Sequence, residues 1–405
     1  MATPAAELDL PHIVLDPDRT REAQRELVRG IAGRSHLART DIGYSALHYD
    51  TVTKVLRDKR WQSAAGLVTQ MSGTADPRLA RDRVSILSAE GDMHVRLRRL
   101  VAPAFSPRSA DRLRPFMRQV VNDLIAPSTA TGRTEFVADV CEPYPIPIIC
   151  ELLGAPKEDW QSFSLWATDI LRIFNGNLTE DADAIVAARD AIDEYVNDLI
   201  AQRRGRPMDD LLTDLIAAEE AGDRLSNEEL VMMVEAVIVG GTDTTRNQLG
   251  LCMSVFLDHP EQWELLRNDP TLAPRAVEEC MRYWGAVNGT MRFASEDIEM
   301  DGVLFPKGTF MSVSLATANH DKAVFADGET FDITKEPVGS PHMSFGSGIH
   351  YCLGASLARA ELQEALEILP QRMPNIVRDG ATVMKPASTA IFGPASMPIA
   401  FDAGH

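Results

Sequence analysis

The sequence predicts one very long helix, over residues 226–258, around which the rest of the chain must pack. Ser226 and Glu229 have the spacing of a capping box, and apolar residues then recur at three-to-four spacing to the end of that range. His259 and Pro260 stop the pattern. At about 1.5 Å per residue, a helix of this length crosses a whole domain.

Most of the remaining chain favours helix as well. Apolar residues have helical spacing in residues 110–125, 181–204, 209–221, 274–284 and 353–369. Strand patterns are short and concentrated late, at 291–300, 303–305 and 310–315, and Asp301-Gly302 suits a tight hairpin turn between the first two. We therefore predict a mainly α fold with a smaller β portion.

No internal repeat and no linker rich in Pro, Gly or Ser divides the 405 residues. We expect a single domain over residues 1–405, with 1–36 as a poorly defined N-terminal segment.

The charge of the chain excludes one class of partner. It has 40 Lys and Arg against 59 Asp and Glu, a formal net charge of −19, with no long Lys/Arg run. Because nucleic-acid binding depends on concentrated positive charge, we expect no nucleic-acid partner. Residues 1–29 scatter charges among short apolar stretches and match neither a signal peptide nor a membrane span. We therefore expect a cytoplasmic protein without a membrane partner.

Five cysteines are an odd number, and no two have the C-x-x-C spacing, so neither a disulfide framework nor a zinc knuckle fits. Four of them lie in apolar or helical stretches, where we expect buried and inert thiols: Cys141, Cys150, Cys252 and Cys280. Cys352 differs because it lies in a glycine-rich turn, residues 345–354, directly before a predicted helix.

The turn around Cys352 suits a thiolate. Backbone N–H groups of the turn and the positive end of the following helix would stabilise the negative charge. A nucleophile would need His350 as its base, yet residues two apart in a loop seldom face each other, so a cysteine hydrolase is disfavoured. A single Cys without clustered Cys or His argues against zinc and iron–sulfur, and leaves a cofactor that brings most of its own ligands, namely haem.

The middle of the long helix carries a second unusual cluster, Gly-Gly-Thr-Asp-Thr-Thr at residues 240–245. Each Gly costs up to about 1 kcal/mol against Ala in a helix, so the cluster departs from what the helix itself prefers. Such departures point to functional sites.

The cysteine turn has the pattern Phe-Gly-x-Gly-x-His-x-Cys-x-Gly, and on these residues the chain resembles the cytochrome P450 family of haem-thiolate monooxygenases from about residue 37 to its end. The resemblance implies a P450 fold, haem b as cofactor, Cys352 as the iron ligand, and Phe345 and Gly346 in the cofactor-binding loop. It also implies activation of O2 and insertion of one oxygen atom into an apolar organic substrate, most simply a hydroxylation.

The resemblance gives the cluster at 240–245 a role as well. It aligns Asp243 and Thr244 with the acid–alcohol pair that delivers protons to dioxygen, and the glycines would open a groove for the oxygen molecule. The bland alternative is a structural kink with Thr244 bonded back to the carbonyl four residues earlier.

Other residues acquire roles by the same resemblance. His94, Arg98, Arg292 and His350 would hold the haem propionates. Glu279 and Arg282 would form a buried network behind the haem, in which this chain has Lys335 where the family usually has Arg, and Lys cannot form the same bidentate fork.

A local excess of arginine interrupts the acidic chain, with Asp111 as the one opposing carboxylate: Arg96, Arg98, Arg99, Arg108, Arg112, Arg114 and Arg118. Either these residues pair with acidic groups elsewhere, or they dock a small acidic electron donor, for which a ferredoxin-type protein with its reductase is the expected kind.

By resemblance, the substrate pocket would draw on the following segments and residues: 62–91, Trp160, Phe163, Trp166, Ile170, Ile173, Phe174, 234–238, 285–290 and 391–392. Asn288 and Thr290 can anchor one polar group of an otherwise apolar ligand. Two alternatives stay open: a peroxide-driven haem-thiolate enzyme and a non-catalytic haem-binding sensor.

Overall fold

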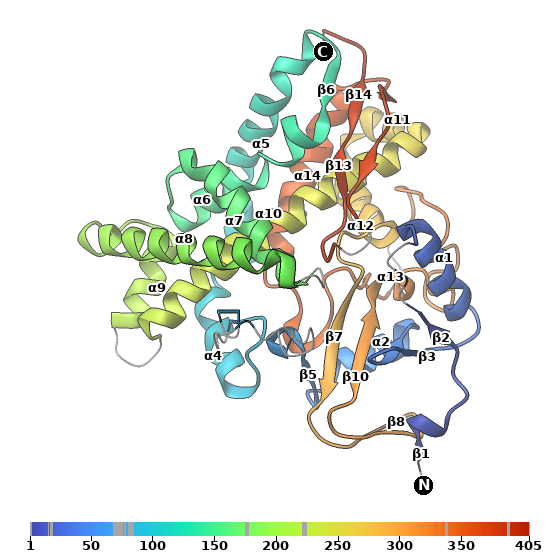
Figure 1. Ribbon diagram of the computed structural model, residues 1–405. Coiled ribbons are helices and arrows are strands. Elements are labelled where there is room, and N and C mark those ends of the chain that lie inside the picture. The colour runs from blue at the N-terminus through green and yellow to red at the C-terminus, as the bar shows by residue number, and fades with distance from the viewer. Residues whose placement is uncertain are drawn as a thin grey trace.

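The computed structural model describes residues 2–14, 16, 19–67, 76, 78–79, 85–174, 178–220, 225–336, 339–386 and 389–404. Helix α10 (Asn227–Asp258) passes through the helical part of the molecule, while the main β-sheet lies to one side of it (Figure 1). The mainly α architecture with a smaller β portion is as predicted.

The helix bounds follow the predicted segments closely. The helices other than α10 are α1 (Arg21–Ala32), α2 (Tyr49–Arg57), α4 (Gly91–Val101), α5 (Pro107–Thr129), α6 (Pro145–Leu153), α7 (Trp160–Leu171), α8 (Leu178–Gly205), α9 (Leu211–Glu220), α11 (Pro260–Asn268), α12 (Ala273–Tyr283), α13 (Leu315–Ala318) and α14 (Ala355–Arg372).

The start of α10 is the predicted capping box. Ser226 Oγ accepts from the backbone N–H of Glu229 at 3.1 Å, and the Glu229 carboxylate accepts from the N–H of Ser226 at 2.9 Å. No described helix is long and apolar enough to cross a membrane.

The main sheet has the strand order β2-β3-β4-β10-β7-β5. Its strands are β2 (His12–Ile13), β3 (Leu37–Thr40), β4 (Gly43–Ala46), β5 (Trp61–Ser63), β7 (Gly289–Ala294) and β10 (Phe310–Ser314). The expectation that strands are concentrated late is therefore wrong for this sheet. Its early strands are too short to show an alternating pattern, and only their pairing with late strands fixes them.

Smaller sheets complete the β portion: β1 (Thr3–Pro4) with β9 (Val303–Phe305) and β8 (Ile298–Met300), β6 (Arg133–Glu135) with β14 (Pro398–Ala400) and β11 (Val377–Arg378), and β12 (Val383–Met384) with β13 (Pro394–Ser396). The predicted strand over 291–300 is divided between β7 and β8. The Asp301-Gly302 turn joins β8 and β9, with both residues at positive φ, as its dipeptide predicts.

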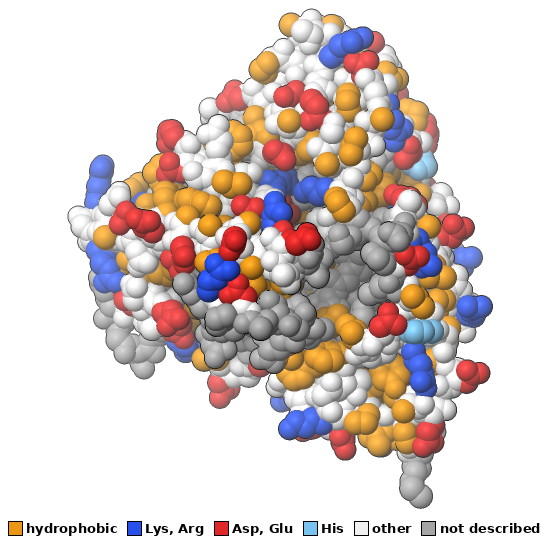
Figure 2. All heavy atoms as spheres, in the orientation of Figure 1, with side chains coloured by type: hydrophobic (Ala, Val, Ile, Leu, Met, Phe, Trp, Pro, Cys, Tyr) orange, Lys and Arg blue, Asp and Glu red, His pale blue; other side chains and the backbone are white. Residues whose placement is uncertain are grey.

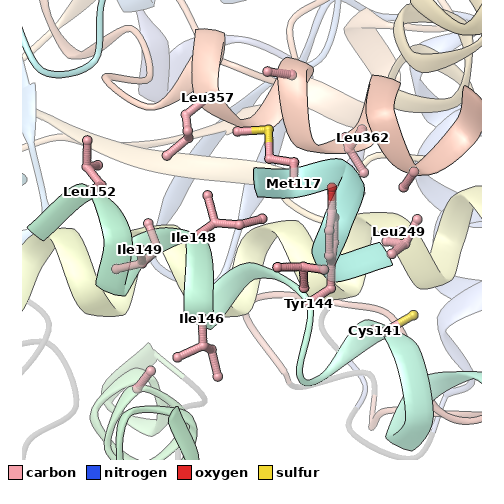
Figure 3. Packing of buried hydrophobic residues seen from close by; sticks show 14 of the residues in the cluster. Met117, Cys141, Tyr144, Ile146, Ile148, Ile149, Leu152, Leu249, Leu357 and Leu362 are labelled. Carbon is pink, nitrogen blue, oxygen red and sulfur yellow. The ribbon is translucent and has the colours of Figure 1, made fainter. Parts of the chain in front are cut away.

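The largest core lies where α10 meets α5, α6 and α14. Helix α6 is apolar almost all round, so it is covered on all sides, and Ile146, Ile148 and Ile149 are fully buried. Figure 3 shows side chains of α5, α6 and α14, including Met117 and Leu357, meeting beside α10. This packing holds α10 and the start of α14 in a fixed relation.

Candidate active site

The loop before α14 gains its shape from two glycines. Gly346 and Gly348 have φ values of 69° and 74°, which residues with a side chain rarely adopt. A Cβ atom at Gly348 would also collide with the carbonyl oxygen of Leu56 at the end of α2. The backbone N–H of Cys352 donates to Phe345 O at 2.9 Å and closes the loop. The sequence therefore builds a tight turn that presents one thiol.

The Cys352 side chain is exposed to solvent, yet burial among protein atoms raises the pKa of its thiol. The two findings agree if the sulfur borders a hollow that solvent can enter. The Gly354 N–H and the guanidinium groups of Arg98 and Arg359 lower the pKa, but burial has the larger effect. The N–H of the turn therefore acts in the direction that the sequence predicts, although burial outweighs it in the protein alone. A metal ion would reverse the balance, because coordination deprotonates a thiol.

Two histidine rings lie against each other beside this loop, with their planes tilted by 58°. The rings of His94, on α4, and His350 are 4.5 Å apart between centroids. His350 Nε2 lies 2.9 Å from Glu90 Oε1, and Glu90 also accepts from the N–H of Ser63 at 2.6 Å. Burial, with the charges of His350 and Arg98, lowers the pKa of His94. His94 is buried, and its Nε2 has no hydrogen-bond partner in the described part of the chain.

Arg292 on β7 is 5% exposed, and its side chain donates to Thr290 Oγ1 and to a main-chain carbonyl, both at 3.0 Å. Burial lowers the pKa of Arg292, and the negative charge of Glu90 acts in the opposite direction. The two side chains form no ion pair in the described structure. Arg98 donates to Ile349 O at 3.2 Å, and burial lowers its pKa too. Buried guanidinium groups bound to neutral acceptors fit an anionic ligand.

Helix α10 continues without interruption through the glycine–threonine cluster. Gly240 is exposed although it lies mid-helix, and a Cβ atom there would meet nothing. Ala236 and Thr244, one turn before and after it, are half-buried, so one stripe of the helix borders open space. Gly241 behaves differently, because a Cβ atom there would collide with Ile149 of α6. Gly240 thus leaves open space beside the helix, whereas Gly241 allows α6 to pack closely against it.

The two candidate proton-transfer residues are adjacent in sequence but interact with different partners. Thr244 Oγ1 donates to Gly240 O at 2.7 Å, which is the back-bond of the structural alternative, and the helix continues through this position. Asp243 is buried and forms an ion pair with Arg246 one turn later. Arg246 also donates to two hydroxyls of α7, Ser164 Oγ at 2.9 Å and Thr168 Oγ1 at 2.6 Å.

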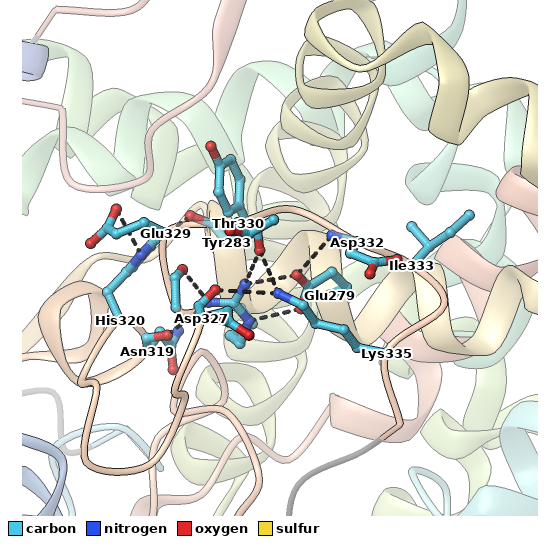
Figure 4. Close-up of polar contacts among 12 residues, drawn as sticks. Glu279, Tyr283, Asn319, His320, Asp327, Glu329, Thr330, Asp332, Ile333 and Lys335 are labelled. Carbon is cyan, nitrogen blue, oxygen red and sulfur yellow. Dashed lines mark hydrogen bonds and ion pairs between the residues drawn. The ribbon is translucent and has the colours of Figure 1, made fainter.

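The Glu279–Arg282 pair is buried on α12. Arg282 donates from Nε and Nη2 to the Glu279 carboxylate, both at 2.7 Å, and to carbonyls of the following loop. Lys335 donates to the carbonyls of Asp327 at 3.2 Å and Thr330 at 2.9 Å (Figure 4). In the described structure, Lys335 therefore binds the loop that follows α12 only through main-chain carbonyls. Its ammonium group forms no hydrogen bond with the Glu279 carboxylate.

Part of the predicted substrate region belongs to the core. Phe163 is fully buried and packs with Trp166 and Tyr195 at centroid distances of 5.8 and 5.1 Å. Asn288 keeps a buried side-chain nitrogen without a partner among the described residues, whereas Thr290 accepts from Arg292. Within residues 62–91, positions 68–75, 77 and 80–84 lie outside the described residues.

Comparison with known proteins decides the family. A family model of cytochrome P450 matches residues 156–373. This chain belongs to the cytochrome P450 family. It is 40% identical to cytochrome P450 107B1 of Saccharopolyspora erythraea over 72% of this chain and 70% of that protein. It is 36% identical to nocardicin C N-oxygenase of Nocardia uniformis subsp. tsuyamanensis over 81% of each. The solved structure of CalO2 superposes with a TM-score of 0.89 at 31% identity, over 97% of this P450 and 100% of that chain.

Membership confirms the prediction from the cysteine turn and makes this P450 a monooxygenase with haem b as its cofactor. The residues present fit that group. An exposed thiol suits the iron, and a buried His with an unpartnered nitrogen and a buried Arg bound to neutral acceptors suit the propionates.

Sequence reasoning missed three residues that shape the site of this P450. Arg246 was detectable, because it stands three residues after Asp243 on a predicted helix. Glu90 and Arg359 gave no signal, since their partners His350 and Glu278 lie far away in the sequence.

Proposed function

We propose that this P450 inserts one atom of O2 into an apolar organic substrate, most simply as a hydroxylation, with electrons from a separate ferredoxin-type protein. The observation that carries the proposal is the accessible Cys352 thiol before α14, together with buried Arg292, whose acceptors are neutral, and buried His94, whose Nε2 has no partner in the described chain.

In this proposal Cys352 ligates the haem iron, with Phe345 and Gly346 in the loop that supports it. His94, Arg98 and Arg292 donate to the propionates, and His350 positions His94 through the ring contact. When bound, the haem supplies the redox chemistry that activates O2, with the thiolate as electron donor to the iron.

The absorption spectrum of the reduced protein with carbon monoxide tests the ligand. Wild type should show the strongly red-shifted Soret band of thiolate-ligated haem, and Cys352→His should lose it. Cys141→Ser is the control, because that thiol is buried in the core and should leave the band in place. If Cys352→His keeps the band, Cys352 is not the ligand.

Thr244 and Asp243 have the proton-handling role. The Thr244 hydroxyl donates to Gly240 O and can turn towards the open space beside that glycine. Asp243 can pass a proton onward only when its carboxylate parts from Arg246. General acid–base groups contribute about 10²-fold or more, so their loss should be large.

Thr244→Ala should therefore divert consumed O2 to hydrogen peroxide and lower product formation by at least about tenfold. Thr242→Ala is a matched control, because Thr242 makes the same back-bond, to Ile238 O at 2.6 Å, but is buried. Equal coupling in both variants would remove Thr244 from the proposal. Wild-type turnover with hydrogen peroxide and without an electron donor would instead favour the peroxide-driven alternative, and absence of turnover under both conditions the sensor.

The arginine-rich segment divides into paired and unpaired residues. Arg96 pairs with Glu229, Arg114 with Asp111 and Glu364, and Arg118 with Glu364 and Glu367. In Figure 2, Lys and Arg side chains are interspersed with Asp and Glu rather than gathered.

Arg108 and Arg112 are exposed at the start of α5 and have no ion-pair partner in the described structure. We place the electron-donor contact on these two residues. The double variant Arg108→Glu/Arg112→Glu should slow reduction by a ferredoxin and flatten its dependence on salt concentration. Arg133→Glu on β6 is the control. An unchanged salt series for the double variant would contradict this docking site.

The substrate is proposed to be apolar with one acceptor group, because Asn288 offers an unpartnered side-chain nitrogen. Asn288→Leu should weaken binding of acceptor-bearing ligands, measured from the spectral shift they cause, and leave purely apolar ligands unaffected.

A further inference from the structure

Arg359, on the second turn of α14, lies between α12 and the cysteine loop. Its Nε and Nη2 donate to the two carboxylate oxygens of Glu278 at 2.6 and 3.0 Å. Its Nη1 donates to the hydroxyl of Tyr351 at 3.1 Å, and its Cζ lies 4.4 Å from the centre of the Phe345 ring. One planar group thus engages a carboxylate along an edge, a hydroxyl at one corner and an aromatic ring on its face.

Both loop residues that Arg359 contacts precede Cys352 in the chain. Phe345 supplies the carbonyl that accepts the Cys352 N–H at 2.9 Å, and Tyr351 directly precedes the cysteine. The Phe345 and Tyr351 rings also approach each other at 6.3 Å. A guanidinium that holds both aromatic residues therefore limits where the Cys352 sulfur can move.

The anchor of Arg359 is itself fixed. The N–H of Ser344 donates to Nδ1 of the buried His342 at 3.1 Å, which leaves the proton of the neutral ring on Nε2. That nitrogen lies 3.3 Å from Glu278 Oε2. Burial opposes ionisation, but His342 and Arg359 together lower the pKa of Glu278 to about 2. Glu278 therefore stays an anion and keeps the arginine fork in one orientation.

We propose that Arg359 is a positioning residue for the Cys352 ligand, which holds the cysteine loop through Phe345 and Tyr351 and raises the reduction potential of the bound haem with its positive charge. The inference rests on the proposed function, in which Cys352 ligates the iron. Arg359 contacts Tyr351, which directly precedes the cysteine, and Phe345, so its charge lies close to the ligand. A cation close to the ligand favours the state with one more electron.

Two substitutions separate charge from geometry in the haem-loaded protein. Arg359→Met removes both, so the midpoint potential should fall, and the red-shifted band of the reduced carbon monoxide complex should decay about tenfold faster in mild urea. Arg359→Lys keeps the charge but forms neither the fork nor the planar stack, so the potential should stay near wild type while the band still decays faster.

Arg275→Met is the matched control, because Arg275 is an ion-paired arginine on α12 whose partner Glu336 is exposed. It should leave both readouts unchanged. The inference is overturned if both Arg359 variants keep the wild-type potential and band lifetime, or if Arg275→Met shifts them equally. Failure of the proposed function would give a different result, because Cys352→His would then retain the red-shifted band although Arg359 is intact.

Discussion

Two regions that flank the cysteine loop treat buried charge in opposite ways. Behind the loop, α12 and α14 pair two arginines with carboxylates, Arg282 with Glu279 and Arg359 with Glu278. On α4 and β7, His94 and Arg292 are buried with neutral acceptors or an unpartnered nitrogen. Burying a charge is costly unless an opposite charge accompanies it. The paired region is therefore complete as protein structure, whereas the unpaired region is the one that fits an anionic ligand.

Breaking a pair should have the largest effect. Arg282→Met leaves Glu279 buried without its partner, so we expect the free energy of unfolding to fall by about 3–5 kcal/mol in urea titrations followed by circular dichroism. Glu264 and Arg267 form an exposed pair, so Arg267→Met should lower the free energy of unfolding far less than Arg282→Met. Similar losses in the two variants would remove the distinction between buried and exposed pairs.

Glu361 extends the comparison to a buried carboxyl group that has no cationic partner in the described chain. Glu361 on α14 is 1% exposed, accepts one bond from Thr245 Oγ1 at 3.2 Å, and has a second oxygen without a partner in the described chain. Burial raises its pKa from 4.5 to about 8, so at pH 7 the folded protein holds a proton that the unfolded chain releases. This contribution to stability is fully present below pH 4.5 and is lost as the pH rises towards 8 and beyond.

Glu361→Gln removes that dependence. The variant should be more stable than wild type by up to about 3 kcal/mol at pH 7 and should gain nothing near pH 4.5, measured by urea titration across the range. Parallel stability curves for the two proteins would show that Glu361 does not titrate in this way.

The smallest expected effect concerns the unpaired cations. Arg292→Met should speed haem transfer to an excess of apomyoglobin by about tenfold or more, because a charge-assisted bond to a propionate is lost. Arg60→Met is the control, since Arg60 lies next to β5 and pairs with Asp58. Equal transfer rates would place Arg292 outside the haem site.

Features with a long or closely spaced signal were predictable from the sequence. The bounds of α10 followed from its capping box and its apolar period, and the cysteine loop followed from fixed spacing within ten residues. Both are local, so no knowledge of the fold was needed to find them.

Features that depend on distant partners were not predictable. The two glycines at 240 and 241 look alike in sequence, yet Gly240 faces open space and Gly241 contacts Ile149. Glu90 was missed because its partner His350 comes from a distant part of the chain. The early strands of the main sheet are likewise defined by residues paired across most of the chain, such as Tyr44 with Met311.

The contact between Gly348 and the carbonyl of Leu56 also bears on how the protein is made. These residues come from opposite ends of the chain, and loop-closure entropy delays such contacts until much of the intervening chain has collapsed. During synthesis α2 leaves the ribosome long before residue 348 is added. The cysteine loop is therefore completed only when translation is almost finished, so cofactor capture by this loop, as proposed above, would be a late step of maturation.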